Sequence, residues 1–133
     1  MNNIEFIDIP KITDPRGNLA VIEGETLPFD IKRVYYLFDV PSDSYRGGHA
    51  HKELYQVLIA LSGSFDVTLK NGKEHEIVTL NKPTKGLLIK PGVWRELENF
   101  SSGSVCLVLA SEKYKESDYI YDYNEFVTYV NQL

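Results

Sequence analysis

Short segments rich in β-branched and aromatic residues follow one another along most of this chain, and each ends near a Gly, Asn, Pro or Ser signal. Such segments are typical of β-strands, and their close spacing is typical of an antiparallel sandwich or barrel. No long helical pattern separates them, which argues against a parallel α/β sheet. Strands are expected over residues 5–9, 18–23, 32–39, 55–61, 65–70, 74–80, 86–90, 94–100 and 104–110.

Two further signals complete the expected fold. The residues DPRG at 14–17 predict a turn, because Pro and Gly supply the backbone angles that a tight turn needs. Near the carboxy terminus, Ser117 and Asp118 are predicted to cap a helix. Its apolar side chains recur at helical spacing: Ile120, Tyr123, Val127 and Val130. The length of 133 residues predicts a single, mostly β domain over 1–133 with one carboxy-terminal helix.

Composition narrows the classes of function. Fourteen basic and nineteen acidic residues give a net charge of −5, which argues against nucleic acid or an anionic membrane as a general partner. The longest apolar runs are far too short to span a bilayer, and the first ten residues, MNNIEFIDIP, lack the regions of a signal peptide. A cytoplasmic location is therefore expected. The single cysteine, Cys106, lies in an apolar run and is expected to be buried and inert.

Two of the three histidines, His49 and His51, occupy alternate positions in the sequence RGGHAH. Alternate side chains of an extended segment project to the same face, so both imidazoles are predicted to enter one space. An imidazole that binds no metal titrates near neutral pH, and it can accept and donate a proton. The pair is therefore the main candidate for catalysis, and the alternative is a solvated edge strand.

The spacing around this pair resembles the two conserved motifs of the cupins, which implies a cupin-type antiparallel β-barrel, or jelly roll. The residues that carry the likeness are Gly47, Gly48, His49, His51, Gln56, Gly63, Gly86, Pro91, Gly92, Arg95 and Asn99. In metal-binding cupins a glutamate and a last histidine complete the site, but here Gln56 and Arg95 hold these positions. A neutral amide is a poor ligand for a divalent metal and a guanidinium repels one. A site without metal or cofactor is therefore predicted.

Arginine usage suggests an anionic ligand. The four arginines lie in or beside turns and strands that a cupin would direct toward its cavity: Arg16, Arg33, Arg46 and Arg95. Guanidinium groups capture phosphate oxygens in pairs, so a sugar nucleotide is a candidate ligand. The alternative is surface ion pairing with nearby acids such as Asp14, Asp30 and Glu96.

Alternation also makes Tyr35 a candidate. If Val34 and Phe38 face away from the cavity, Arg33 and Tyr35 share the opposite face, and the phenol of Tyr35 becomes a donor in the site. Trp94 and Phe100 are weaker candidates for stacking on a base, because aromatic residues of β proteins usually pack in the core.

Longer segments extend the resemblance to the sugar 3,4-ketoisomerases that act on dTDP-4-keto-6-deoxyglucose. They are ITDPRGNLAVIE, PFDIKRVYYLFDV, RGGHAHKELYQVLIALSGS, GLLIKPGVWREL and VCLVLASEKYKESDYI. The resemblance implies a metal-free cupin that works as a homodimer with exchanged amino-terminal strands. It also implies that the enzyme moves a ketone from C4 to C3 of the hexose, for the synthesis of 3-amino-3,6-dideoxy sugars.

The resemblance assigns roles to the catalytic candidates. His49 is implied to be the base that removes the C3 proton, which the adjacent carbonyl acidifies. His51 or Tyr35 then relays protons or polarises the oxygen of the enediolate. The reaction involves no net redox change, which agrees with the absence of a Gly-rich nicotinamide-binding motif.

The substrate-binding candidates leave one point open. Arg33 or Arg46 is expected to bind the pyrophosphate. The other candidate substrate-binding residues are Arg16, Arg95 and Gln56. Two subgroups of the family differ in the configuration that C4 acquires. Arg16 is similar to the galactose-forming type and Arg95 to the glucose-forming type, so the configuration of the product is not assigned.

Three other functions compete with this hypothesis. A 3,5-epimerase on the same nucleotide sugar would use a histidine with a carboxylate partner, for which Glu53, Asp66 and Glu96 are the candidates. A non-catalytic sugar-nucleotide-binding cupin would keep the arginines but need no base. A metal-dependent oxygenase would require the ligands that Gln56 and Arg95 replace.

Overall fold

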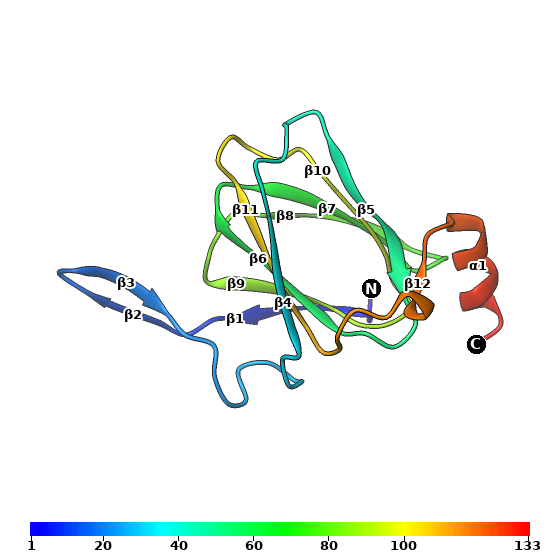
Figure 1. Cartoon of the computed structure of the whole chain (residues 1–133), viewed down its shortest axis with the longest axis horizontal. Helices are drawn as coiled ribbons and strands as arrows, with labels where there is room; N and C mark the ends of the chain where they lie inside the picture. Colours follow the sequence, from blue (N-terminus) through cyan, green and yellow to red (C-terminus); the bar gives the residue numbers. More distant parts are fainter.

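Two five-stranded antiparallel sheets face each other and form a barrel (Figure 1). This computed structural model describes residues 1–133, and the surroundings of every residue except Gly47. The first sheet has the order β1 (Ile4–Asp8), β9 (Lys85–Ile89), β6 (Gln56–Ser62), β11 (Val105–Ala110) and β4 (Arg33–Phe38). The second has the order β12 (Tyr119–Ile120), β5 (Tyr45–His51), β10 (Trp94–Glu98), β7 (Phe65–Lys70) and β8 (His75–Leu80). The mostly β, cupin-like architecture expected from the sequence is confirmed.

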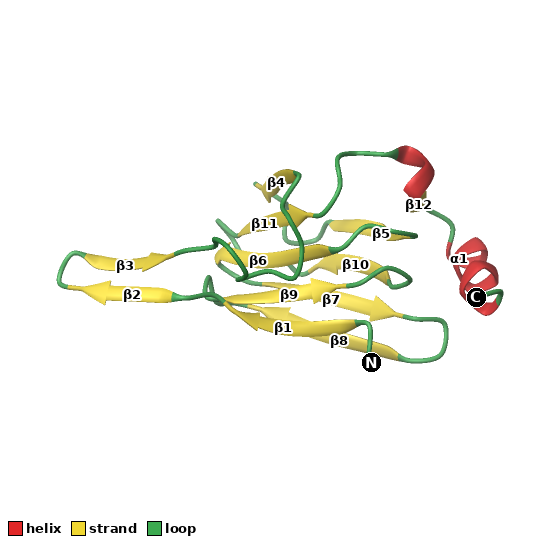
Figure 2. Ribbon diagram, turned by 90° about the horizontal axis from the view of Figure 1, so that it is seen from below, coloured by secondary structure: helices red, strands yellow, loops and turns green.

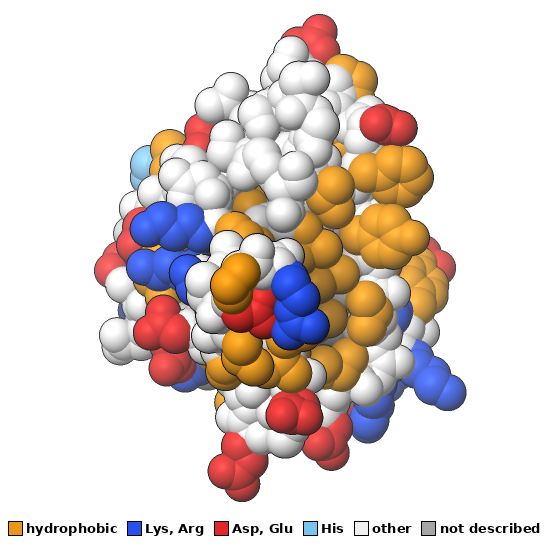
Figure 3. Space-filling model, turned by 90° about the vertical axis from the view of Figure 1, so that its left-hand side faces the viewer, with side chains coloured by type: hydrophobic (Ala, Val, Ile, Leu, Met, Phe, Trp, Pro, Cys, Tyr) orange, Lys and Arg blue, Asp and Glu red, His pale blue; other side chains and the backbone are white. Residues whose placement is uncertain are grey.

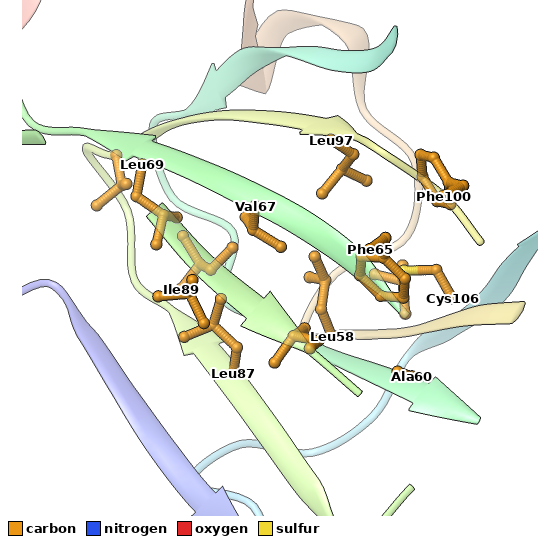
Figure 4. Close-up of a cluster of buried hydrophobic side chains, with 14 residues drawn as sticks. Leu58, Ala60, Phe65, Val67, Leu69, Leu87, Ile89, Leu97, Phe100 and Cys106 are labelled. Carbon is orange, nitrogen blue, oxygen red and sulfur yellow. The ribbon is translucent and has the colours of Figure 1, made fainter. Parts of the chain in front are cut away.

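The space between the sheets is filled by apolar side chains over most of its length. Leu58 and Ala60 of β6 face Val67 and Leu69 of β7 in a cluster of buried residues (Figure 4). Strand β6 is buried on both faces, because Val57 and Ile59 pack on its other side. Its continuous run of apolar residues follows from this position in the middle of a covered sheet.

The nine expected strands are all present, with ends that shift by a few residues. Their turns include the segment between β7 and β8, where Asn71 accepts hydrogen bonds from the backbone N–H groups of Lys73 and Glu74. Three strands are not among the nine. Strand β5 was expected only as an extended segment that carries the histidine pair, and β2 (Lys11–Asp14) and β12 were missed because each is too short to show an alternating pattern.

Strands β2 and β3 (Gly17–Ala20) form a projecting hairpin that extends away from the barrel (Figure 2). The predicted turn at 14–17 joins them, and Gly17 there has a φ of 125°, which favours glycine. Ile12 pairs with Leu19 across the hairpin, and both side chains are more than half exposed. The hairpin therefore carries apolar side chains that the rest of this chain does not cover.

The carboxy-terminal helix begins later than the sequence predicted. Residues Glu116–Asp118 form a short 3₁₀ helix, β12 follows, and α1 spans Tyr123–Asn131. The cap of α1 is Asp122, whose side chain accepts a hydrogen bond from the backbone N–H of Glu125. The expectation that Ser117 and Asp118 cap the helix is wrong, because Asp118 is buried and β12 pairs with the edge of β5.

An exposed apolar area lies on the outer side of β4. Val34, Tyr36 and Phe38 are each more than half exposed, while the alternate residues of the strand face the interior. Figure 3 shows exposed hydrophobic side chains gathered on one side of the molecule, next to the projecting hairpin. No helix in the part of the chain that the structure describes is long and apolar enough to cross a membrane.

Candidate active site

Both histidines of β5 point into the space between the sheets, as their alternation predicts. Their rings lie nearly perpendicular, and the two Nε2 atoms are 3.1 Å apart. His51 is completely buried, whereas His49 is partly exposed and lines a cavity of about 80 Å³. Gly48 directly precedes His49 with a φ of 26°, and a Cβ there would lie 2.9 Å from the Tyr45 hydroxyl. The backbone just before the first histidine therefore favours glycine.

Asp118 contacts the ring nitrogen of buried His51 that does not face His49. Its Oδ2 lies 2.9 Å from Nδ1 of His51, and its Oδ1 accepts a hydrogen bond of 2.7 Å from the backbone N–H of Glu53. Burial lowers the pKa of His51 to about 2, and the positive charge of Arg95 and the neighbouring His49 act in the same direction. His51 is therefore neutral at pH 7, and an acidic partner from a distant part of the chain fixes its ring.

Sequence reasoning missed Asp118 and also Tyr119. We expected Asp118 to cap a helix and Tyr119 to pack on it, but Tyr119 pairs with His51 across β12 and β5. The ring centres of Tyr119 and His51 are 4.3 Å apart, and those of Tyr119 and His49 are 5.2 Å apart. No local pattern marks either residue, because a two-residue strand brings them to the histidines.

A chain of hydrogen bonds links three predicted site residues. Buried Arg95 donates from Nη1 to Oε1 of Gln56 at 2.5 Å, and Nε2 of Gln56 donates to the Tyr35 hydroxyl at 3.1 Å. Because guanidinium nitrogens only donate, the amide of Gln56 can face Arg95 only with its oxygen. Burial raises the pKa of Tyr35, so the phenol keeps its proton at pH 7 and can donate it into the cavity.

Arg95 is a buried cation in the wall of this site. The backbone oxygen of Val93 accepts a second hydrogen bond from it, and its Nε has no hydrogen-bond partner among the residues whose surroundings are described. Burial lowers the pKa of Arg95 to about 10, while nearby Tyr35 and Tyr119 act in the opposite direction. The guanidinium is still charged at pH 7, so the cavity wall favours negative charge.

The other arginines occupy three different places. Arg33 of β4 donates from Nη2 to the Tyr119 hydroxyl at 3.1 Å, which connects the edge of one sheet to the edge of the other. Its guanidinium lies 4.7 Å from the ring centre of Tyr35, and its buried Nη1 has no hydrogen-bond partner in the described part of the structure. Arg46 is exposed and lines the cavity. Arg16 lies at the tip of the projecting hairpin, ion-paired with Asp14, and does not line the cavity of its own chain.

Several weaker candidates lie outside the site. Trp94 packs against Phe126 of α1 on the outer face of the second sheet, and Phe100 packs against Phe65 in the core. Asp66 bonds to Thr79 and Asn99 near the surface, and Glu96 accepts a hydrogen bond from the Trp94 indole. The carboxylate that contacts a histidine is Asp118 instead.

The donor set does not suit a metal ion. Among the residues with described surroundings, no group of three or more His, Cys, Asp or Glu is arranged to hold one. Gln56 is turned with its oxygen toward Arg95, and the guanidinium of Arg95 lies in the wall of the same cavity as His49. A divalent cation beside the two imidazoles would therefore face a fixed positive charge.

The fold and this site define a cupin-type β-barrel enzyme whose cavity is lined by a histidine, a tyrosine and a buried arginine that is hydrogen-bonded to a glutamine. The family model described as "FdtA: WxcM-like, C-terminal" matches residues 2–131. The chain therefore belongs to the FdtA, WxcM-like family.

Curated and solved relatives agree with this assignment. The chain is 47% identical over 130 residues to TDP-4-oxo-6-deoxy-alpha-D-glucose-3,4-oxoisomerase of Aneurinibacillus thermoaerophilus, covering 97% of this chain and 94% of that protein. The crystal structure of QdtA, a sugar 3,4-ketoisomerase from Thermoanaerobacterium thermosaccharolyticum in complex with TDP, matches with a TM-score of 0.97 and 47% identity over 99% of this chain and 97% of that one. A histidine-to-asparagine variant of QdtA in complex with TDP-4-keto-6-deoxyglucose matches equally, with a TM-score of 0.97 and 47% identity over 99% and 96% of the two chains.

Proposed function

We propose that this protein is a sugar 3,4-ketoisomerase that converts dTDP-4-keto-6-deoxyglucose into a dTDP-3-keto-6-deoxyhexose in the cytoplasm. The observation that carries the proposal is the histidine pair, with Nε2 atoms 3.1 Å apart, at a cavity that also holds a phenol and a buried guanidinium. These groups are a base, an acid and a fixed positive charge, which are what an enediolate reaction requires. The substrates named for the relatives support the choice of ligand.

The chemistry begins at C3 of the hexose, where the adjacent C4 carbonyl makes the hydrogen acidic. His49 removes this proton, because it lines the cavity whereas His51 is completely buried behind it. The electrons of the C3–H bond form a C3–C4 double bond, and the C4 oxygen becomes negatively charged. Tyr35 donates a hydrogen bond to that oxygen, and Arg95 stabilises the charge at short range.

The second half of the reaction returns the proton to carbon. As the C3 carbonyl forms, the proton of the C3 hydroxyl passes through Tyr35 or His51 to the negatively charged C4 oxygen, which becomes a hydroxyl. His49 delivers the proton that it took from C3 to C4. No electron leaves the sugar, so no redox cofactor takes part. The same residues serve both steps, because the two carbons are neighbours.

The nucleotide is proposed to lie at the open edge between β4 and β12. Arg33 stands there with an unpartnered Nη1, which suits a phosphate oxygen, and Arg46 lines the nearby cavity. The volume of about 80 Å³ is too small for a whole nucleotide sugar, so the phosphates and base must extend outward from it.

We propose further that the protein is a homodimer with exchanged amino-terminal strands. The projecting hairpin exposes Ile12 and Leu19, and β4 exposes an apolar strip that this chain leaves uncovered. Burying both against a second copy would remove apolar surface from water, which favours association. In such a dimer, Arg16 would enter the active site of the partner subunit.

One observation favours a second candidate, the 3,5-epimerase. That enzyme would need a histidine paired with a carboxylate, and His51 and Asp118 form such a pair. The two reactions differ in where hydrogen exchanges and in the product. Epimerisation introduces solvent hydrogen at C3 and C5, whereas ketoisomerisation introduces it at C4 and creates a 3-keto sugar.

The test is to incubate the purified protein with dTDP-4-keto-6-deoxyglucose in deuterated water, together with a 3-aminotransferase and its amino donor. A 3-amino sugar, identified by NMR, is the expected product, and its coupling constants also reveal the configuration at C4. Deuterium at C5 without any 3-amino sugar would establish epimerase chemistry instead. Recovery of unchanged substrate would indicate a binding protein without catalysis.

A further inference from the structure

The buried residue Asp118 has three hydrogen-bonding links to the last residue of β5 and the two residues that follow it. Its two oxygens contact Nδ1 of His51 and the backbone N–H of Glu53, and its backbone oxygen accepts from the N–H of Lys52 at 3.0 Å. Only about 7% of the residue is exposed. Burying an ionised carboxylate is costly unless each oxygen is hydrogen-bonded, and both oxygens of Asp118 are.

These contacts determine where His51 carries its hydrogen. An ionised carboxylate only accepts hydrogen bonds, so Nδ1 of His51 must be the protonated nitrogen. A neutral imidazole with hydrogen on Nδ1 has a lone pair on Nε2, and that atom lies 3.1 Å from Nε2 of His49. His51 is therefore an acceptor toward His49.

We propose that Asp118 is a positioning residue that acts on the reaction through His51. It keeps His51 in the Nδ1–H tautomer, and His51 in turn accepts a hydrogen bond from His49 and orients its ring. When His49 takes a proton from the sugar, the negative carboxylate of Asp118 stabilises the resulting positive charge through the hydrogen bonds of His51. The inference rests on the proposed role of His49 as base, but the tautomer of His51 can be measured without any substrate.

The informative substitution is Asp118→Asn. The N–H of Glu53 requires an oxygen as its acceptor, so the new amide group would turn its NH₂ toward Nδ1 of His51. His51 would then have to accept at Nδ1 and carry its hydrogen on Nε2, facing His49. His51 could then no longer accept a hydrogen bond from His49, although asparagine has nearly the same shape as aspartate.

The first measurement is ¹⁵N NMR of the histidine rings in the full chain. We expect Nδ1 of His51 to be protonated in the wild type and Nε2 to be protonated in D118N. Glu116→Gln, in the same 3₁₀ helix but exposed, is the matched control and should leave the tautomer as it is in the wild type. A wild-type His51 with hydrogen on Nε2, or a D118N protein with hydrogen still on Nδ1, would overturn the proposal.

The second measurement is turnover, and it separates positioning from a purely structural role. D118N should lower kcat by about 10²-fold or more with little change in KM, as expected when an acid–base group is misdirected. In a His51→Asn background, D118N should lower kcat much less, because the histidine through which Asp118 acts is absent. Equal losses in both backgrounds would reject the proposal. A wild type without isomerase activity would instead reject the proposed function, and the NMR result would still decide the role of Asp118.

Discussion

The guanidinium of Arg95 and the amide of Gln56 are hydrogen-bonded to each other inside the barrel, with Nη1 of the first 2.5 Å from Oε1 of the second. The cupin resemblance implies that these two positions hold ligands in the metal-binding cupins. With Arg95 and Gln56 there, the fixed positive charge favours an anion in the cavity over a metal cation. The Tyr35 phenol completes the arrangement, because Gln56 also donates to it.

Reversing these two changes should create a metal site. Gln56→Glu with Arg95→His would supply a carboxylate and a third imidazole next to His49 and His51. We expect the double variant to bind about one Ni²⁺, Mn²⁺ or Zn²⁺ per chain, measured by elemental analysis after dialysis. The single variant Gln56→Glu is the control and should bind none, since its carboxylate would pair with Arg95. A folded double variant without metal would contradict this account of the site.

Removing the base should abolish turnover but not binding. His49→Asn is expected to lower kcat by about 10²-fold or more, the usual contribution of a positioned acid or base. Binding of TDP, measured by calorimetry, should stay close to the wild-type value, because the proposed phosphate contacts are made by Arg33 and Arg46. His75 is exposed on β8, so His75→Asn is the matched control and should change neither kcat nor the binding of TDP. Near-normal turnover by the His49 variant would reject its role as base.

The buried neutral histidine should make the fold less stable in acid. The pKa of His51 is near 6.5 in the unfolded chain and is lowered to about 2 in the folded one. Below pH 6.5 the unfolded state therefore binds the additional proton, and the stability that His51 contributes above pH 6.5 is lost progressively as the pH falls toward 2. Between pH 7 and pH 5 the loss from this residue is about 1–2 kcal/mol.

Urea unfolding at several pH values would measure this loss. The His51→Asn variant should show a weaker fall in the free energy of unfolding between pH 7 and pH 5 than the wild type. The carboxylates titrate in both proteins, so the difference reports His51. Identical pH dependence in the two proteins would mean that the histidine is not held neutral.

A mixture of two inactive variants should regain activity if Arg16 works across the dimer. In a hybrid of Arg16→Ala and His49→Asn chains, one site would combine an intact His49 with the Arg16 of the partner subunit. About a quarter to a half of wild-type activity per hybrid dimer is then expected after co-expression, with each variant alone as the control. Absence of any recovery in a verified hybrid dimer would place Arg16 outside the partner's site.

Much of the fold follows from local sequence patterns. Period-two alternation and turn residues predicted nine strands and the turn at 14–17, because both depend on residues within a few positions of one another. The same alternation predicted that His49 and His51 share a face, and that Arg33 and Tyr35 lie opposite Val34. The chemical types at positions 56 and 95, together with the cupin resemblance, led to the prediction of a site without metal.

Only the tertiary structure revealed the partners of these residues. Asp118 lies 67 positions from His51 in sequence, and Tyr119 lies 86 from Arg33, yet each pair is in hydrogen-bonding contact. Contacts of this kind arise because strand β12 attaches to the free edge of β5, a pairing that two residues cannot encode by themselves. The sequence by itself therefore determined the strands and the chemistry each one carries. The packing of the two sheets decided which groups meet, since closing the barrel brings distant segments together at its open edge.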